Sequence, residues 1–263
     1  MVLDVGSGGN PFPRSDVLLD RLTGDDHRCG EAMMIDRACV FGDAASMPFK
    51  DNAFDFVIAS HILEHMPEPE VFIKELQRVG KAGYIETPNA LMERFHPYNI
   101  HCLELLNING ILHINKKAKP VIDQYLGTKN LLGEKSEFGQ IMFKHPKLFH
   151  IEYLWDKSIE YKIHNSEVSC DWIEEINDMN IQGEHKESFT DDIVQGAGWR
   201  EYGMLFVNAW HSYKRKKRLK NFDLISILAC PSCHADLEKN NNKLHCNSCN
   251  KTFSYEGEIP NFN

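Results

Sequence analysis

A cluster of glycines close to the start of the chain constrains the fold most. Gly6, Gly8 and Gly9 follow directly on the apolar run Val2–Val5, a pattern that predicts a buried strand ending in a tight loop. Glycine has no Cβ atom, so such a loop lets a ligand approach the backbone closely. Loops at the carboxyl ends of parallel strands are where open α/β sheets bind ligands. The first nine residues therefore predict an α/β domain with a ligand site beside its first strand.

Further apolar runs continue this pattern over the first ninety residues. They predict strands over residues 16–20, 40–41, 54–60 and 83–87 and a helix over 67–79, an order typical of a parallel sheet with crossovers. Asp20 and Asp43 follow the second and third runs. A carboxylate there can accept hydrogen bonds from ribose hydroxyls or from an adenine amino group. A glycine loop alone also fits a simple turn, but acids at successive strand ends favour a nucleotide-type ligand.

The chain after residue 100 has a different character. Asn109-Gly110 between two apolar runs predicts a hairpin over 102–114. Residues 149–155 and 159–164 have the pattern of a second antiparallel pair, with helix expected over 118–147 and one or two helices over 168–220. The last of these ends in a basic run, 214–220, which either contacts phosphates or is a solvated helix end. We expect domains over 1–167, 168–220 (a helical connector) and 221–263.

Composition excludes several classes of protein. The chain has 42% hydrophobic and 25% charged residues and a formal net charge of −9, which is typical of a globular protein and argues against broad nucleic-acid binding. No apolar stretch reaches the roughly 18 residues of a membrane span, and the first residues lack the pattern of a secretory signal. We therefore expect a cytoplasmic protein without a membrane partner.

Four segments in order resemble the class I S-adenosylmethionine-dependent methyltransferases. They are Val2-Leu-Asp-Val-Gly-Ser-Gly-Gly9, Gly42-Asp-Ala-Ala-Ser-Met-Pro-Phe49, residues 51–60 and Leu63-Glu-His65, and the resemblance covers roughly residues 1–90. It implies a Rossmann-like α/β fold whose seven-stranded sheet has a reversed last hairpin. It also implies S-adenosylmethionine as the cofactor.

The resemblance also implies a cofactor site, residue by residue. Gly6, Ser7 and Gly8 would line the methionine part, Asp20 would hold the ribose, and Asp43 with Ala44 would flank the adenine. Ser60 and His61 would face the sulfonium, and the implied cofactor-binding set is Asp4, Gly6, Ser7, Gly8, Asp20, Asp43, Ala44 and Ser60. The chain departs from the family loop, since its third glycine comes early and Asn10-Pro11 follows. The family usually has a helix ahead of the first strand that covers the cofactor. In its place we expect a partner chain, a second copy or the 168–220 helices to cover the pocket, or nothing to cover it.

Histidines and carboxylates near the predicted fourth and fifth strands are candidates for the chemistry. His61, Glu64 and His65 are spaced i, i+3 and i+4, which places them on one helix face and suits a divalent metal, a general base or a purely structural role. A similar ExxEH segment holds magnesium in some methyltransferases, although the first position here is His61. The residues that we expect to take a proton from the acceptor are His61, Glu86, His96 and His101. The Asn/Asp-Pro-Pro-aromatic signature of amine and nucleobase methylation is absent at 59–62.

Two CxxC pairs near the end of the chain predict a metal site. Cys230, Cys233, Cys246 and Cys249 form CxxC–x12–CxxC, which places four thiolates around a structural Zn²⁺, with a redox dithiol as the alternative. Residues 224–262, including Gly257-Glu-Ile-Pro260, resemble the zinc-ribbon activator subunit of tRNA and translation-factor methyltransferases. This resemblance implies a stabilising or partner-binding module fused to its own methyltransferase.

These expectations lead to one function and two alternatives. The leading one is methyl transfer from S-adenosylmethionine to an oxygen or nitrogen atom of a small-molecule or saccharide-type acceptor. The alternatives are methylation of RNA or a translation protein, and a non-catalytic scaffold that presents the ribbon to another methyltransferase.

Overall fold

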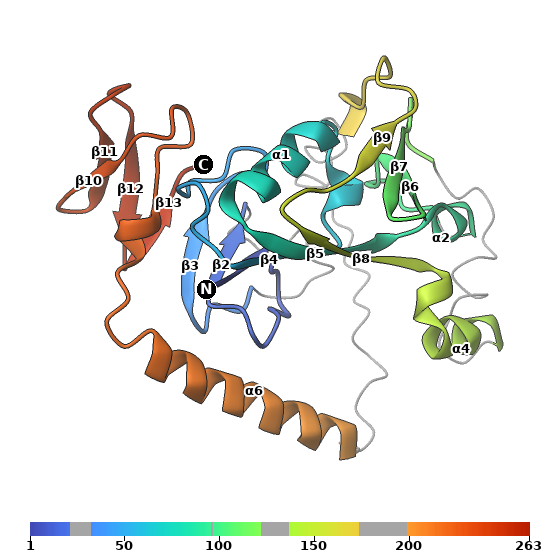
Figure 1. The fold of residues 1–263 in the computed structure, drawn as a ribbon, viewed down its shortest axis with the longest axis horizontal. Coiled ribbons are helices and arrows are strands. Elements are labelled where there is room, and N and C mark those ends of the chain that lie inside the picture. Colours follow the sequence, from blue (N-terminus) through green and yellow to red (C-terminus); the bar gives the residue numbers. More distant parts are fainter. Residues whose placement is uncertain (22–32, 96, 122–136, 174–198) are drawn as a thin grey trace, which may run out of the picture. The chain divides into compact units, whose positions relative to one another are not determined.

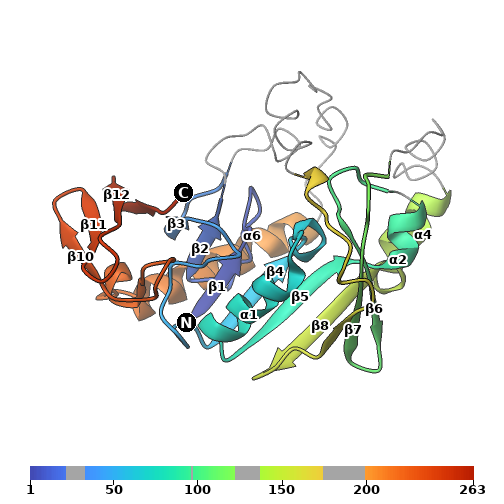
Figure 2. The same cartoon turned by 90° about the horizontal axis from the view of Figure 1, so that it is seen from above.

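The computed structural model describes residues 1–21, 33–95, 97–121, 137–173 and 199–263 (Figures 1 and 2). The chain divides into two compact units, which are described in turn. The first unit comprises residues 1–58 and 78–81 and the described residues from 199 onward. The second comprises residues 59–77 and 82–173.

Three short parallel strands form the centre of the first unit. They are β1 (Val2–Val5), β2 (Val17–Asp20) and β3 (Ala38–Phe41), with β2 between the other two. The register pairs Leu3 with Val17, and Val17 with Ala38. Most side chains of these strands are buried on both faces, as expected of a parallel sheet whose strands are continuous apolar runs. The predicted strands are thus confirmed here.

The C-terminal ribbon extends this sheet. Its strands are β10 (Leu237–Asn240), β11 (Lys243–Cys246), β12 (Thr252–Glu256) and β13 (Ile259–Asn261), which pair antiparallel in sequence order. β13 then pairs with β3 in parallel, with Asn261 opposite Phe41, and Phe262 N donates a 2.8 Å hydrogen bond to Phe41 O. Figure 1 shows β13 next to β3. The described sheet has ten strands, four from the ribbon and six from the methyltransferase part. The expected count of seven methyltransferase strands is therefore wrong, because the hairpin over residues 103–116 belongs to a separate sheet.

A second set of backbone contacts joins the ribbon to the same core. The segment after η3 (Leu224–Ile227) forms an antiparallel bridge between Leu228 and Phe49, both fully buried. Ala229 N donates to Pro48 O at 3.0 Å, and Lys50 N donates to Ile227 O at 2.9 Å. The ribbon therefore shares its hydrophobic core with residues 1–58.

The long helix α6 (Trp199–Arg218) confirms a helix within 168–220; residues 174–198 lie outside the described part. Arg215 and Arg218 from its basic end form ion pairs with Asp36 and Asp16. At least these two residues of the basic run therefore hold the helix in place through ion pairs within the first unit. Among the residues that the structure describes, no helix is long and apolar enough to cross a membrane.

The boundary between the two units falls within β4 (Phe56–Ser60), and the second unit begins at Ala59. It continues through η1 (Leu63–His65), α1 (Pro69–Val79), β5 (Ala82–Pro88) and α2 (Ala90–Phe95). β8 (His150–Asp156) runs antiparallel to β5 along its whole length (Figure 2). The predicted pairing of 149–155 with 159–164 is wrong. β8 buries alternate residues on one face of the sheet and pairs along its whole length with β5, a strand of equal length. In contrast, β9 (Tyr161–Ile163) has only three residues and pairs in parallel with β7.

A small sheet completes the second unit. β6 (Leu103–Ile108) and β7 (Ile111–Lys116) form the predicted hairpin, with Asn109 and Gly110 at φ values of 55° and 81°. Both values are positive, as a two-residue hairpin turn requires. The helix expected over 118–147 is present in part as α4 (Glu137–Lys144), followed by η2 (Pro146–Leu148); residues 122–136 lie outside the described part.

Candidate functional site

The loop after β1 is held in an open, left-handed conformation. Gly6 and Gly8 have φ values of 68° and 54°, a region that residues with a Cβ atom rarely adopt. Gly6 N donates to Leu19 O at 2.8 Å, and Gly8 N donates to Asp20 Oδ2 at 3.0 Å. The carboxylate that ends β2 therefore supports the backbone of the glycine loop.

Two buried polar side chains lie in the same loop region. Ser7 Oγ is buried and makes no hydrogen bond within the described part of the chain. Buried hydroxyls usually have a partner, so this one marks a position where a ligand can supply it. Asp4 Oδ2 accepts a 2.7 Å hydrogen bond from Phe12 N. Burial raises the pKa of Asp4 to about 6, against the opposing effect of that N–H group.

The end of β3 lies beside the end of β2. Gly42 N donates to Asp20 O at 2.9 Å. The exposed Asp43 accepts a 2.8 Å hydrogen bond from Ala45 N, and Ala44 is buried. All the predicted cofactor residues except Ser60 thus gather at the carboxyl ends of β1, β2 and β3 in the first unit. Their role in binding stays a prediction, as does that of Ser60.

In the second unit, the candidate residues His61 and Glu86 lie close together. His61 N donates to Glu86 O at 2.8 Å, and the ring Nε2 lies 3.9 Å from Glu86 Oε1. Its Nδ1 lies 3.4 Å from Glu64 Oε1. The Glu64 carboxylate raises the pKa of His61 against the effect of burial, with Glu86 adding to the rise. Tyr84 OH donates to Glu86 Oε2 at 3.0 Å.

The expected helix face through His61, Glu64 and His65 is wrong. Only Leu63–His65 are helical, as a single 3₁₀ turn, and His61 has a φ of 54° ahead of it. The three side chains are neighbours through this turn rather than through α-helical spacing.

The two other candidate bases have different surroundings. His101 is buried, stacks on Tyr98 at 4.7 Å between ring centroids, and donates from Nδ1 to Glu93 Oε1. His96 lies outside the described residues. The catalytic roles of both stay predictions.

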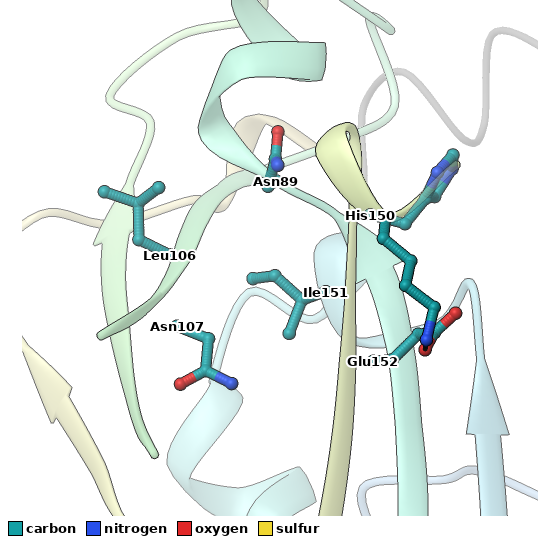
Figure 3. Close-up of a pocket in the computed structure, with 7 residues that line it drawn as sticks. Asn89, Leu106, Asn107, His150, Ile151 and Glu152 are labelled. Atoms are coloured by element: carbon teal, nitrogen blue, oxygen red, sulfur yellow. Dashed lines mark ion pairs between the residues drawn. The ribbon is translucent and has the colours of Figure 1, made fainter. Parts of the chain in front are cut away.

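A cleft of about 410 Å³ lies in the second unit (Figure 3). Its lining comes from the end of β5, from β6, and from η2 with the start of β8, and consists of Asn89, Leu106, Asn107, Lys147, His150, Ile151 and Glu152. Most of these side chains are polar. The His150 ring lies edge-on to that of His61, with 5.4 Å between centroids, so the cleft borders the histidine–carboxylate group.

The four ribbon cysteines form a compact thiol cluster. Their sulfur atoms all lie within 4.8 Å of one another, with Cys230 Sγ 3.5 Å from Cys249 Sγ and Cys233 Sγ 3.4 Å from Cys246 Sγ. Sulfurs bound to one tetrahedral Zn²⁺ at about 2.3 Å are separated by about 3.8 Å. The cluster therefore fits the predicted structural Zn²⁺.

The backbone around the cysteines repeats in both CxxC turns. His234 N donates to Cys230 O, and Asn250 N donates to Cys246 O, each at 2.8 Å. His234 and Asn250 both have positive φ values, 57° and 60°. The N–H groups aimed at Cys246, chiefly that of Cys249, lower its thiol pKa to about 7. Such a turn favours the thiolate that binds metal.

Sequence reasoning did not find several groups of the second unit. Glu93, Lys117 and His150 lie beside the candidate histidines only through tertiary contacts. A local signal is present only for Glu93, a carboxylate near the start of a short helix that also carries buried apolar residues.

Comparisons with known proteins agree with the two parts of the chain. Residues 15–85 match the family model "Methyltransferase domain", and residues 221–254 match "Trm112p-like protein". Ajmaline N-methyltransferase of Rauvolfia serpentina is 48% identical over 42 residues, which are 16% of this chain and 14% of that protein. Demethylmenaquinone methyltransferase of Staphylococcus haemolyticus is 46% identical over 85 residues, 30% of this chain and 36% of that protein. The chain thus spans about a third of the length of one relative and about a seventh of the length of the other.

A solved complex between the Haloferax volcanii Trm112 methyltransferase activator and a methyltransferase matches at 14% identity and a TM-score of 0.38. It covers 60% of this chain and 82% of the matched chain. The chain therefore carries a methyltransferase domain, matched over residues 15–85, and a Trm112p-like segment, matched over residues 221–254, that contains the four-cysteine cluster.

Proposed function

We propose that this protein transfers the methyl group of S-adenosylmethionine to an oxygen or nitrogen atom of a small-molecule or saccharide-type acceptor. The observation that carries the proposal is the loop after β1. Its glycines have positive φ values, Asp20 supports its backbone, and the Ser7 hydroxyl is buried without a partner. This arrangement suits a nucleotide-type cofactor, since the glycines let it approach the backbone closely and the Ser7 hydroxyl remains for one of its polar atoms.

The chemistry is a direct displacement. A lone pair of the acceptor forms a bond to the sulfonium methyl carbon while the carbon–sulfur bond breaks, which leaves S-adenosylhomocysteine. The acceptor then holds one proton too many, and a nearby base takes it. His61 with Glu86 is the candidate base, because two carboxylates stabilise the imidazolium that forms.

Three observations support a small acceptor. The relatives named above are methyltransferases whose names specify alkaloid and quinone substrates. The cleft beside His150 has a volume that suits a small molecule, and its amides and charged groups suit a hydroxylated one. The net charge of −9 disfavours a polyanionic acceptor.

The ribbon supports its own methyltransferase domain in this proposal, rather than that of another enzyme. The edge of β13 is already paired with β3 of the same chain, and Leu228 is buried against Phe49. A ribbon engaged in this way has no free β13 edge for a second methyltransferase.

Methylation of RNA or of a translation protein is a second candidate, favoured by the Trm112p-like match at residues 221–254. RNA binding through phosphates weakens steeply as salt rises. Retention of RNA by the full chain that is lost between low and moderate salt favours this candidate.

The test is calorimetry of the zinc-replete full chain with S-adenosylhomocysteine, followed by transfer of labelled methyl from S-adenosylmethionine to a panel of hydroxylated and amine acceptors. We expect one binding site of micromolar affinity and one or more labelled products. An absence of binding by folded, zinc-replete protein contradicts the enzyme and favours the scaffold. Binding without transfer to any small acceptor, but with transfer to RNA or protein, favours the second candidate.

A further inference from the structure

Three largely buried side chains in the second unit, separate from the ribbon cysteines, are of the types that bind metal ions. Glu64, His65 and His101 each place one ligand atom within 4.8 Å of those of the other two. Such a triangle has a central point within about 2.8 Å of all three atoms, and metal–nitrogen and metal–oxygen bonds are about 2.0–2.2 Å long. Small side-chain shifts therefore close the site around an ion.

The two histidines are oriented by partners on their other ring nitrogen. His65 Nδ1 lies 3.0 Å from Ile100 O, and His101 Nδ1 bonds to Glu93 Oε1. A carbonyl or carboxylate oxygen only accepts, so both Nδ1 atoms carry the proton and both Nε2 atoms keep a free lone pair in the neutral rings. A carbonyl or carboxylate behind each imidazole is the usual arrangement around metal-bound histidine.

The carboxylate of Glu64 likewise has one atom held by a hydrogen bond and another available to a ligand. Oε2 accepts a 3.0 Å hydrogen bond from Thr87 Oγ1, whereas Oε1 is buried and makes no hydrogen bond within the described residues. His61 Nδ1 lies 3.4 Å from Oε1. Glu64 itself is fully buried, and an ionised, unsatisfied oxygen in such a place is costly unless a cation or donor meets it.

Among the described residues, the charges around the cluster leave Glu64 without a full countercharge. Glu64 and Glu93 are both fully buried, and Lys117 Nζ neutralises Glu93 through a 2.7 Å contact with Oε2. The remaining buried negative charge is that of Glu64. His61 can offset part of it when protonated, but its side chain is 49% exposed.

The backbone holds the cluster rigidly. Cys102 N donates to Glu64 O at 2.8 Å, which places the residue after His101 directly against η1. The rings of His65 and His101 lie edge to face, with 4.6 Å between centroids. Two elements far apart in sequence thus present their ligands to one point.

We propose that Glu64, His65 and His101 bind a divalent first-row transition-metal ion, such as Zn²⁺ or Mn²⁺. Two imidazoles and one carboxylate suit these ions better than Mg²⁺ or Ca²⁺, which prefer oxygen ligands. Three protein ligands leave coordination positions open to water or to an oxygen atom of a ligand. This proposal does not depend on the proposed methyl transfer.

The test measures metal content of the full chain. The protein is dialysed against Zn²⁺ or, with the ribbon already zinc-replete, against Mn²⁺, passed through a desalting column and analysed by mass spectrometry for metal per chain. We expect two ions per wild-type chain and one in Glu64→Gln and His101→Ala. The second ion should also raise the wild-type melting temperature and leave that of Glu64→Gln unchanged.

His113→Ala is the matched control. His113 and His164 form a surface pair, with 2.7 Å between Nδ1 and Nε2, that could collect an adventitious ion; the control should keep two ions. Glu64→Gln decides the result if His101→Ala fails to fold, because glutamine keeps the volume and the oxygen that Thr87 contacts. One ion per wild-type chain under both conditions overturns the proposal. A second ion that both cluster variants retain also overturns it.

Discussion

The backbone N–H of Gly8 donates a 3.0 Å hydrogen bond to Asp20 Oδ2, so the loop after β1 and the last residue of β2 are held by one carboxylate. Asp20 is thus both a support for the glycine loop and, in the proposed function, the group that accepts from the ribose. A charged acceptor makes such a bond stronger than a neutral pair.

Asp20→Ala should therefore weaken S-adenosylhomocysteine binding. A hydrogen bond to a charged group contributes roughly 1.5–3 kcal/mol, which corresponds to an affinity loss of roughly tenfold to a hundredfold. Calorimetry measures the loss. Asp51→Ala removes the same charge from an exposed position that pairs with Arg78 and should leave the affinity unchanged. Equal affinities for wild type and Asp20→Ala would remove Asp20 from the cofactor site.

Asp4→Asn should change how stability depends on pH. The folded-state pKa of about 6 lies above the ordinary value of 3.8, so the folded protein holds this proton more tightly than the unfolded chain does. Stability contributed by the protonated carboxyl is therefore present below about pH 4 and lost as pH rises through 6. Relative to wild type, the variant should gain roughly 2–3 kcal/mol between pH 4 and pH 7.5.

Urea unfolding of both proteins at the two pH values measures this gain. Asparagine keeps the oxygen that accepts from Phe12 N, so packing around the loop changes little. A stability difference between the two proteins that is the same at pH 4 and pH 7.5 contradicts a raised pKa for the buried Asp4 carboxyl.

Cys246→Ser should lower zinc content and the stability of the whole first unit. Metal binding and folding of a four-thiolate ribbon are coupled, and the ribbon shares buried Leu228 and Phe49 with residues 1–58. We expect less than one zinc per chain and a melting temperature lower by several degrees. Ser232→Ala, in the other CxxC turn, removes only the hydrogen bond from Lys251 Nζ and should keep both values. A fully metallated Cys246→Ser chain would falsify a site built from all four thiolates.

Phe262→Pro should weaken the join between the ribbon and β3. Proline has no N–H group, so Phe41 O loses its 2.8 Å partner. The aromatic ring of Phe262 also contacts Phe253, with 4.8 Å between centroids. Phe262→Ala removes this ring but keeps the N–H, which makes it the control. Unfolding in urea should show the proline variant less stable than the alanine variant by roughly 1–2 kcal/mol; equal stabilities would show that the parallel pairing contributes little.

Local pattern explains how much of the fold was predictable. The strands β1 to β5, helix α1 and the hairpin of Asn109 and Gly110 all agree with the sequence, because each is a short apolar run bounded by a glycine, proline or acid. The pairing of strands that are far apart in the sequence leaves no such local pattern. β8 pairs with β5 and β9 pairs with β7, and the choice of partner cannot be read from either strand alone.

The candidate sites show the same difference between local patterns and long-range contacts. Spacing along the chain was enough to predict the cysteine set of the ribbon and the glycines and acids at the strand ends. In contrast, the folded chain was needed to show that His101 and Glu93 lie beside Glu64 and His65, and that β13 adds to β3. The physical reason is that these contacts depend on which elements pack together, and burial and pairing between distant segments are properties of the assembled core.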